Sequence, residues 1–504
     1  MLEPRGFPWG GRIRQDRVAG QRRLSGAWIF SLLLVLFFSQ ARAAGNVLFS
    51  SQDHTPRFTL EQAIAEALQN NRLIQEAEEK VRAALADTRS ARADFFPKAS
   101  AAYRYTYLDQ KPFMYFDAYE VEPAQLDPAD PSSQVGVITG RKTTKAVTAP
   151  HDNFHWELSL QQPLFTGFAL SALFRMSRLN LDIKELERQL AERDVVRNVK
   201  TGYYRILLAE KMLRVAEENV TSLLAHHQDT LSFFEQGLIA WNEVLQAEVA
   251  LSEARQQQTR AEGSLAMSRA ALNTILGRDV NHSFQVRDQQ AIRFHDFRLQ
   301  TLLETAETNR EELRKLELSL QKIEEGERLA KSDLYPSLFL KSSYEQDGEN
   351  LQADTNDFRN DQNFRVTLQA EWTLFNWGKR RAEISSAQHD SLALQHKLRH
   401  LEEQIRLEVN NSLIQLNTAR RNIETAERAV RQARENLRIT NLQYEQQMAT
   451  STEILDAHTF LTRAKSNHYR AMYEYTINLA NLERAVGVAD LSAQAQGPSE
   501  GTQP

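Results

Sequence analysis

The chain has 504 residues, of which 25% are charged and 9% aromatic, with only 19 glycines and 13 prolines. This composition is typical of long solvated helices rather than of a loop-rich globule. The net charge of −5 argues against nucleic acid as a partner, and the absence of cysteine excludes disulfides and a thiol nucleophile.

The first 43 residues have the form of an export signal. Basic residues precede an apolar run over residues 28–38, and residues 41–43 offer a small-x-small cleavage site. The run is about half as long as a membrane-spanning helix, so an anchoring helix is the less favoured alternative. We predict a signal peptide over 1–43 and an N-terminal linker over 44–57. Without the signal peptide, which carries seven arginines and two acids, the net charge is −10.

The remaining sequence repeats itself in tandem. Pairs at a constant offset of 210 are Phe154 with Phe364, Glu235 with Glu445, and Gly277 with Gly487. Upstream, Pro97 and Pro336 correspond at an offset of 239, so the first copy carries an insertion of 29 residues. We predict a first repeat over 58–277, a linker over 278–297, a second repeat over 298–487 and a disordered tail over 488–504.

Each repeat opens with a helical pattern that stops at a proline and gives way to alternation of apolar and polar residues. A capping box at Thr59 precedes the first pattern, which has an interruption near Asn71. The alternation predicts two hairpins with about ten residues per strand, a length that crosses an outer membrane when tilted. The hairpin tips, residues 108–152 and 345–361, are rich in charge, and the first also contains five prolines, Pro123 among them. Both tips predict solvated loops, the longer one outside the cell.

A long helix follows each hairpin. Residues 168–234 and 379–446 contain almost no helix-breaking residue, and each predicts a helix of about 100 Å with an apolar stripe suited to coiled-coil packing. Each helix folds back at a short turn, and a second helix returns to Gly277 or Gly487.

Four membrane strands cannot close a barrel, and an open sheet edge in lipid leaves backbone groups unpaired. The sequence therefore predicts that several copies of the chain assemble around a shared axis.

The strand-to-helix segments resemble those of a known family. Residues 162–167 (QPLFTG) and 372–380 (WTLFNWGKR) are similar to the signature of TolC-like outer membrane efflux proteins, and residues 95–97 and 334–336 are similar to its helix-to-strand signature. The resemblance covers residues 58–488. The junction positions within these segments are Pro97, Pro163, Gly167, Pro336 and Gly378.

The resemblance implies a mainly α fold with β strands: a trimeric α-helical barrel of long coiled-coil hairpins, continuous with a transmembrane β-barrel to which each chain gives four strands. It places the protein in the outer membrane of a Gram-negative bacterium, extending into the periplasm. The implied partners are a homotrimer, outer-membrane lipid, a periplasmic adaptor (membrane fusion) protein and an inner-membrane pump of RND, ABC or MFS type. The implied function is a passive conduit for efflux or type I secretion, without enzymatic activity or a cofactor.

An alternative interpretation is an exported periplasmic or surface coiled-coil protein with structural or adaptor duties. It accounts for the helices and the export signal, but it leaves the two alternating hairpins unexplained.

The turns between the long helices are the candidate docking tip for the adaptor. By resemblance, the docking residues are Gly237, Leu238, Glu243, Val244, Leu245, Met448, Glu453, Ile454 and Leu455. Gln447 stands where the family pattern has glycine, which departs from the expected turn. Ordinary packing of a helical hairpin is the competing explanation of this pattern. Charged residues near the tip that are candidates for an entrance gate are Asp229, Glu235, Arg438 and Glu445.

His226 and His227 are adjacent, so they do not have the spacing of a metal-binding pair on a helix, and we interpret both as solvated surface residues. The sequence contains no phosphate-binding loop, dinucleotide fingerprint or nucleophile elbow.

Overall fold

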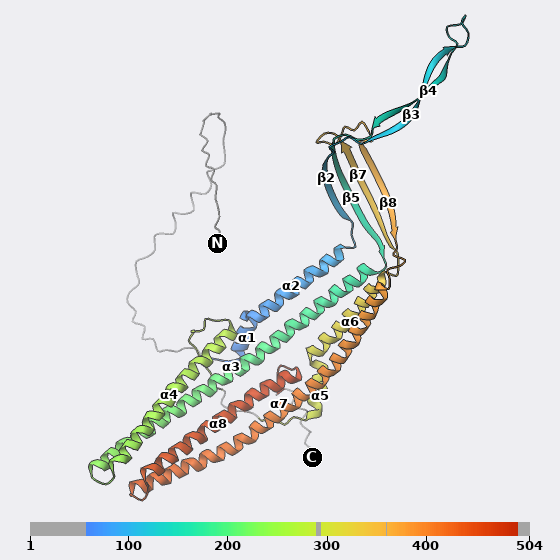
Figure 1. The fold of residues 1–504 in the computed structure, drawn as a ribbon. Helices are drawn as coiled ribbons and strands as arrows, with labels where there is room; N and C mark the ends of the chain where they lie inside the picture. Colours follow the sequence, from blue (N-terminus) through green and yellow to red (C-terminus); the bar gives the residue numbers. More distant parts are fainter. Residues whose placement is uncertain (1–56, 289–293, 359, 492–504) are drawn as a thin grey trace, which may run out of the picture. The chain divides into compact units, whose positions relative to one another are not determined.

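The computed structural model describes residues 57–288, 294–358 and 360–491 (Figure 1). The predicted signal peptide, the predicted linker up to residue 56 and the predicted tail beyond residue 491 lie outside the described residues. The helices are α1 (Leu60–Asn70), α2 (Arg72–Ala93), α3 (Ala169–Glu235), α4 (Trp241–Leu276), α5 (Leu299–Asn309), α6 (Glu311–Ser332), α7 (Lys379–Glu445) and α8 (Ser451–Val486). The strands are β1 (Arg57–Phe58), β2 (Lys98–Tyr107), β3 (Phe113–Gln125), β4 (Gln134–Val147), β5 (Asp152–Thr166), β6 (Gln285–Val286), β7 (Ser337–Gly348) and β8 (Gln362–Glu371).

The helices come in pairs of equal length. α1 and α5 have 11 residues each, α2 and α6 have 22, α3 and α7 have 67, and α4 and α8 have 36. α3 and α4 form one antiparallel hairpin and α7 and α8 form another (Figure 1). The predicted bounds of the two longest helices agree with the structure to within one residue. At 1.5 Å per residue, each of them is about 100 Å long.

Local chemistry sets the helix ends. Thr59 accepts a hydrogen bond from the Gln62 amide at 3.3 Å and completes the predicted capping box before α1. The predicted interruption near Asn71 is also present, because its extended backbone separates α1 from α2. The Asn71 amide group caps α2 and donates to the Ile275 carbonyl at 2.7 Å. α4 and α8 end at Gly277 and Gly487, both at positive φ.

Four strands form one antiparallel sheet in the order β2-β5-β7-β8. Because directly paired residues point to the same side, the register brings the apolar members of all four strands onto one face. Tyr105 pairs with Phe154, Leu158 with Tyr344, and Tyr344 with Phe364. The other face is polar, with His155 bonded to Asp347 at 3.0 Å and Lys341 3.4 Å from Glu157. The predicted four strands with one apolar and one polar face are therefore confirmed.

The prediction of a loop throughout the first tip was wrong. Within residues 108–152, β3 and β4 form a second, two-stranded antiparallel ribbon with a bulge between Glu120 and Val121. The prolines suggested a loop, but Pro123 lies in β3 opposite Gly136, at a position that an edge strand tolerates. The concentration of aromatic residues over 113–119 (FMYFDAY) was the signal that favours a strand here.

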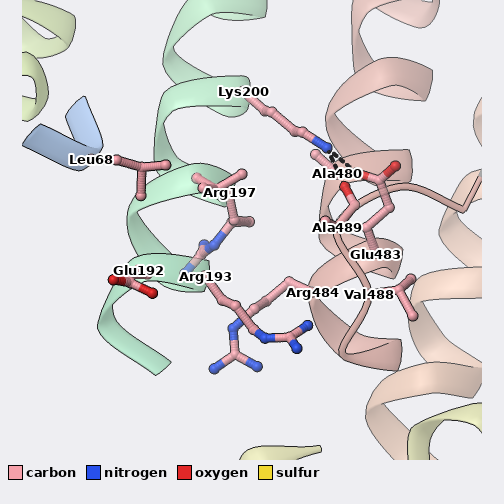
Figure 2. A pocket seen from close by; sticks show the side chains of 11 residues that line it. Leu68, Glu192, Arg193, Arg197, Lys200, Ala480, Glu483, Arg484, Val488 and Ala489 are labelled. Carbon is pink, nitrogen blue, oxygen red and sulfur yellow. Dashed lines mark hydrogen bonds and ion pairs between the residues drawn. The ribbon is translucent and has the colours of Figure 1, made fainter. Parts of the chain in front are cut away.

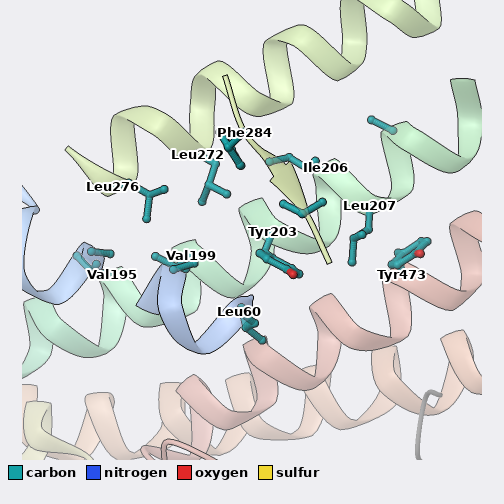
Figure 3. Packing of buried hydrophobic residues seen from close by; sticks show 14 of the residues in the cluster. Leu60, Val195, Val199, Tyr203, Ile206, Leu207, Leu272, Leu276, Phe284 and Tyr473 are labelled. Atoms are coloured by element: carbon teal, nitrogen blue, oxygen red, sulfur yellow. The ribbon is translucent and has the colours of Figure 1, made fainter. Parts of the chain in front are cut away.

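Two buried clusters hold the helices together. The first lies where α1, α3 and α4 meet around the short parallel pair β1-β6 and includes Tyr203, Ile206, Leu272 and Leu276 (Figure 3). The Tyr203 hydroxyl lies 2.9 Å from the Phe58 carbonyl oxygen and 2.6 Å from that of Arg287, so it fastens the β1-β6 pair to α3. The second cluster occupies the equivalent place among α5, α7 and α8. Among the described residues, no helix has the combined length and hydropathy of a membrane span.

Candidate functional site

The first helical turn, between α3 and α4, is closed by a glycine. Gly237 has φ +71°, and its amide donates to the Phe234 carbonyl at 2.8 Å while the Leu238 amide donates to the Phe233 carbonyl at 2.9 Å. The pair satisfies two carbonyl groups at the end of α3. A Cβ at Gly237 would meet nothing within 4 Å, so the turn is open to solvent in this chain.

The second turn, between α7 and α8, has the same backbone path without a glycine. Gln447 adopts φ +60°, and its amide donates to the Tyr444 carbonyl at 2.9 Å, while the Met448 amide donates to the Gln443 carbonyl at 2.7 Å. The departure from the family pattern therefore leaves the turn geometry intact and places a side chain in the left-handed region. Thr450 and Glu453 form a capping box that starts α8.

The predicted docking residues divide by exposure. Leu238, Leu245 and Met448 are exposed by 46%, 44% and 78%, Glu453 is also exposed, and Glu243 is half-buried. Val244 and Ile454 are buried inside their hairpins. Leu455 is half-buried and packs against Leu223, Leu251 and Ala254 of the other hairpin. The exposed members are therefore available to a partner, and the others hold the tips in shape.

The four predicted gate residues are all exposed near the tips. Arg438 is bonded to Glu435 of its own helix at 2.7 Å, and this contact raises the pKa of Arg438 and lowers that of Glu435. Asp229, Glu235 and Glu445 have no ion pair in the described part of the chain. The local field at the tips is therefore acidic.

A buried histidine joins the two hairpins just above the turns, and here the prediction of a solvated residue was wrong. His226 of α3 is 4% exposed, and its Nε2 lies 2.9 Å from Oγ of the fully buried Ser451 of α8. Burial, together with His458 and His227 nearby, lowers the pKa of His226 to about 4, so the ring is neutral at pH 7. No local pattern predicts this contact, because the partner of His226 lies 225 residues away along the chain.

The strand-to-helix junctions use paired left-handed residues. Gly167 and Phe168 have φ +59° and +72° before α3, and Trp377 and Gly378 have φ +52° and +83° before α7. A Cβ at Gly167 would lie 2.3 Å from the Ser332 carbonyl oxygen, so only glycine fits beside the end of α6. At Gly378 a Cβ would meet nothing within 4 Å, and Trp377 is 91% exposed.

The prolines of the junctions lie where the chain changes its structure. Pro97 and Pro336 stand immediately before β2 and β7, where they prevent the preceding helices from continuing. Pro163 lies inside β5, at an irregularity in its pairing with β7. The first strand-to-helix junction is therefore packed against another part of the same chain, and the second is open to solvent.

A belt of ion pairs connects α3 to the second repeat. Arg484 of α8 donates to Asp194 of α3 and to Glu312 of α6, each at 2.7 Å. Burial opposes the charge of Arg484, but these two carboxylates outweigh it and raise its pKa. Arg193 also bridges to Glu311 and to the Gly487 carbonyl. The belt therefore joins α3 to α6, to α8 and to the residue that follows α8.

A cavity of about 290 Å³ opens beside this belt (Figure 2). Lys200 donates to Glu483 at 2.6 Å and to the Ala489 carbonyl at 2.9 Å across it. Burial raises the pKa of Glu483 even though Lys200 opposes this rise. Among the described residues, Arg197 on the cavity wall has no ion pair. The other basic groups at the cavity already have acidic or carbonyl partners. We therefore interpret the contacts around the cavity as structural packing between α3 and α8.

The sequence matches the family described as "Outer membrane efflux protein" over residues 63–278 and 302–488. The outer membrane protein TolC of Vibrio cholerae is 23% identical over 372 residues, which span 70% of this chain and 82% of TolC. The structure of the Campylobacter jejuni CmeC outer membrane channel is similar with a TM-score of 0.70 at 16% identity, covering 87% of this chain and 88% of CmeC. The open state of the Neisseria gonorrhoeae MtrE outer membrane channel is similar with a TM-score of 0.64 at 16% identity, covering 85% of this chain and 89% of MtrE.

The chain belongs to the outer membrane efflux protein family. It is an outer-membrane channel protein of the tripartite efflux type, it extends into the periplasm, and it is not an enzyme. The predicted family, the mainly α fold with β strands and the cellular location are confirmed on this basis, and the alternative of a free coiled-coil protein is not favoured.

Proposed function

We propose that three copies of this chain close into one channel, and that the tips of its helical hairpins dock onto a periplasmic adaptor coupled to an inner-membrane pump. The channel is then a passive conduit, because the pump supplies the energy and the selectivity. The first and second repeats fall at 58–277 and 298–487, and each repeat gives one strand hairpin and one long helical hairpin to the tube.

The unequal surroundings of equivalent elements support closure by sister copies. β5 lies between β2 and β7, whereas its counterpart β8 is an edge strand with only β7 beside it. In the same way α3 packs against both α2 and α6, whereas α7 packs against α6 alone among these shorter helices. In each case the tandem repeat assigns the missing position to an element near the start of the chain, which is β2 for the strands and α2 for the helices. A second copy that places its β2 beside β8, and its α2 beside α7, restores both.

The strand directions allow this closure. The sheet is antiparallel throughout, so β8 and the β2 of the next copy run in opposite directions and continue the same pattern. Three copies of four strands give an even-numbered barrel, and closure removes the unpaired edges that lipid does not tolerate. The apolar face then meets lipid, and the face with His155, Glu157 and Lys341 lines the water-filled lumen.

The repeat also predicts the register of the seam. Leu158 of β5 pairs with Tyr344 of β7. The offsets of 210 and 239 convert this pair into Leu368 of one copy beside Tyr105 of the next.

A double cysteine variant tests this seam. The chain has no natural cysteine, so Tyr105→Cys with Leu368→Cys introduces the only two thiols. Within one chain the two positions lie on opposite edges of the sheet, three strand spacings or at least about 14 Å apart, so a disulfide forms only between copies. We expect oxidation to give covalent trimers in outer-membrane fractions. The matched control Tyr105→Cys with Gln369→Cys points to opposite faces and should give none. A soluble monomer in the periplasm would contradict the proposal.

A tryptophan in the first turn tests docking. Gly237→Trp places a large side chain at an open position, and we expect loss of efflux or secretion with the trimer retained. The matched control is Gly263→Trp in α4, where an added Cβ also meets nothing within 4 Å. Normal export by Gly237→Trp would show that this turn does not contact the adaptor.

A further inference from the structure

The contact between α3 and α6 inside the chain has a counterpart that only a second copy supplies. α2 and α6 are equivalent helices at an offset of 239, and α3 and α7 are equivalent at an offset of 210. Because α3 packs against α6, the repeat places α7 of one copy against α2 of the next. We call the α3-α6 contact the inner contact and the α7-α2 contact the outer contact. The charged residues of the inner contact identify those that meet at the outer one.

Two ion pairs hold the inner contact. Arg193 of α3 bridges to Glu311 of α6, and Lys315 of α6 lies 3.4 Å from Glu187 of α3. Burial opposes the charge of Glu187, but Lys184 of its own helix, at 2.8 Å, and Lys315 outweigh this effect and lower its pKa. The Glu187 carboxylate thus binds one base of its own helix and one base of the neighbouring helix.

The outer contact receives the same two pairs with their signs exchanged. The offsets convert the first inner pair into Glu403 of α7 and Arg72 of α2, and the second into Lys397 of α7 and Glu76 of α2. In the inner contact the long helix supplies the base of the first pair and the acid of the second. In the outer contact it supplies the acid of the first pair and the base of the second. Opposite charges therefore meet in both contacts, but in opposite senses.

The four outer residues are all exposed in the single chain. Lys397 has no ion pair within the described part of the chain. Glu403 lies 3.9 Å from the ring of His400 on its own helix, and Arg72 donates to the Gln75 side chain at 2.9 Å. Contacts of this kind between residues three apart on a helix surface are weak. The side chains are therefore available to a partner.

The remaining outer residue, Glu76, resembles its inner counterpart in its surroundings. One of its carboxylate oxygens accepts from Lys80 of its own helix at 2.6 Å. Glu187 in the same way accepts from Lys184 through one oxygen, and its other oxygen faces Lys315 of α6. The second oxygen of Glu76 can receive a lysine of a neighbouring helix without loss of the first bond.

We propose that the outer contact is held by Arg72 with Glu403 and by Glu76 with Lys397, and that the exchanged signs select the correct partner edge. The proposal rests on the trimer of the proposed function. An α2 edge that displaced α6 from α3 would bring Arg72 beside Arg193, and a similar conflict of like charges arises when α7 takes the place of α3. Since like charges in contact oppose a wrong partner, ring closure is favoured over assemblies in which chains exchange their helices.

The exchange is confined to these two pairs. Three further polar contacts of α3 with the second repeat, made by Lys322, Glu483 and Lys465, have no pair of opposite charge as their counterpart. The equivalent residues are Asp390 with Ala83, Asn410 with Asn273, and Arg428 with Arg255. Selection by charge is therefore located beside the first half of α2 and not nearer the hairpin tips.

A chain with all four signs exchanged tests the pairs. The exchanged chain carries Arg72→Glu, Glu76→Lys, Lys397→Glu and Glu403→Arg. Its outer contact again joins opposite charges, so we expect a normal amount of trimer in the outer membrane. A half-exchanged chain with only Arg72→Glu and Glu76→Lys places like charges at both pairs, and we expect its trimer yield to fall at least about tenfold. Because these residues are exposed in the single chain, neither variant disturbs its core.

Co-expression of differently tagged chains tests the selection of partners. Every trimer that mixes exchanged and unmodified chains contains two mismatched outer contacts. We therefore expect mixed trimers to be at least about tenfold rarer than in the control, in which both tagged chains are unmodified. Sequential affinity purification from detergent extracts measures the mixed fraction.

The outcomes separate these pairs from the trimer itself. Equal trimer yields of the exchanged and half-exchanged chains, or mixed trimers at the level of the control, would overturn the exchanged pairs and leave the trimer standing. Absence of the disulfide between Tyr105→Cys and Leu368→Cys in an otherwise unmodified chain would overturn the trimer, and the exchanged pairs with it.

Discussion

At the scale of single residues, the two hairpin turns share one backbone conformation, with glycine in the first turn and glutamine in the second. A left-handed residue with a side chain costs about 1–2 kcal/mol, partly offset by the greater entropy that glycine loses on folding. We expect Gln447→Gly to stabilise the second turn by about 0.5–1 kcal/mol and Gly237→Ala to destabilise the first by a similar amount. Thermal unfolding of the detergent-solubilised protein measures both. A lower midpoint for Gln447→Gly would show that the Gln447 side chain makes a stabilising contact.

The buried His226 makes stability depend on pH. Its pKa is about 4 in the folded protein and about 6.5 when unfolded, so between these values the unfolded chain binds a proton that the folded chain does not. The stability contributed by the neutral ring is present above pH 6.5 and is lost as the pH falls toward 4, by up to roughly 3 kcal/mol.

The variant His226→Gln tests whether His226 causes this pH dependence of stability. Glutamine keeps a polar group near the Ser451 hydroxyl and does not titrate, so the fall of the unfolding midpoint between pH 7 and 4.5 should become shallower. His389→Gln on the exposed surface of α7 is the control and should keep the original slope. An unchanged slope in His226→Gln would assign the acid sensitivity to other groups.

At the scale of elements, the belt between α3, α6 and α8 contributes more than the many ion pairs on the helix surfaces. Arg484→Met removes a largely buried cation that bridges the half-exposed Asp194 and the half-buried Glu312, and we expect a loss of about 2–4 kcal/mol. Arg438→Met removes an exposed pair within α7 and should have no measurable effect. Chemical denaturation measures the loss of unfolding free energy in the two variants. Equal losses would mean that the belt contributes no more than an exposed ion pair.

The sequence predicted some elements well for physical reasons. The long helices were predictable because residues 379–446 contain no proline or glycine, and because Pro97 and Pro336 end the helical pattern before the first strand of each hairpin. The ribbon was missed because Pro123 was interpreted as a loop residue, although an edge strand accepts it. The belt and the His226 contact were beyond prediction. At 25% charged residues, a pairing such as Arg484 with Asp194 has no local signature and depends on how the two hairpins pack.

At the scale of the whole molecule, most of the functional inference rests on the alternation of apolar and polar residues in four short segments. It identified the strands and both faces of the sheet before any register was known, since a one-residue shift would exchange the faces. The same alternation does not reveal which strands lie at the edges. That information came from the order β2-β5-β7-β8, and it turns the tandem repeat into a predicted seam between copies.

Two neighbouring substitutions in β8 test which face meets lipid. Leu368 lies on the apolar face and Thr367 on the polar one, both near the middle of the strand. An arginine facing the middle of a bilayer costs about 2–4 kcal/mol, whereas one that faces a water-filled lumen costs little. We expect Leu368→Arg to reduce the amount of trimer in the outer membrane. Thr367→Arg should insert normally and shift the ion selectivity of the reconstituted channel toward anions, because its charge lies in the conduction path. The reverse result would mean that the apolar face lines an interior and not a membrane surface.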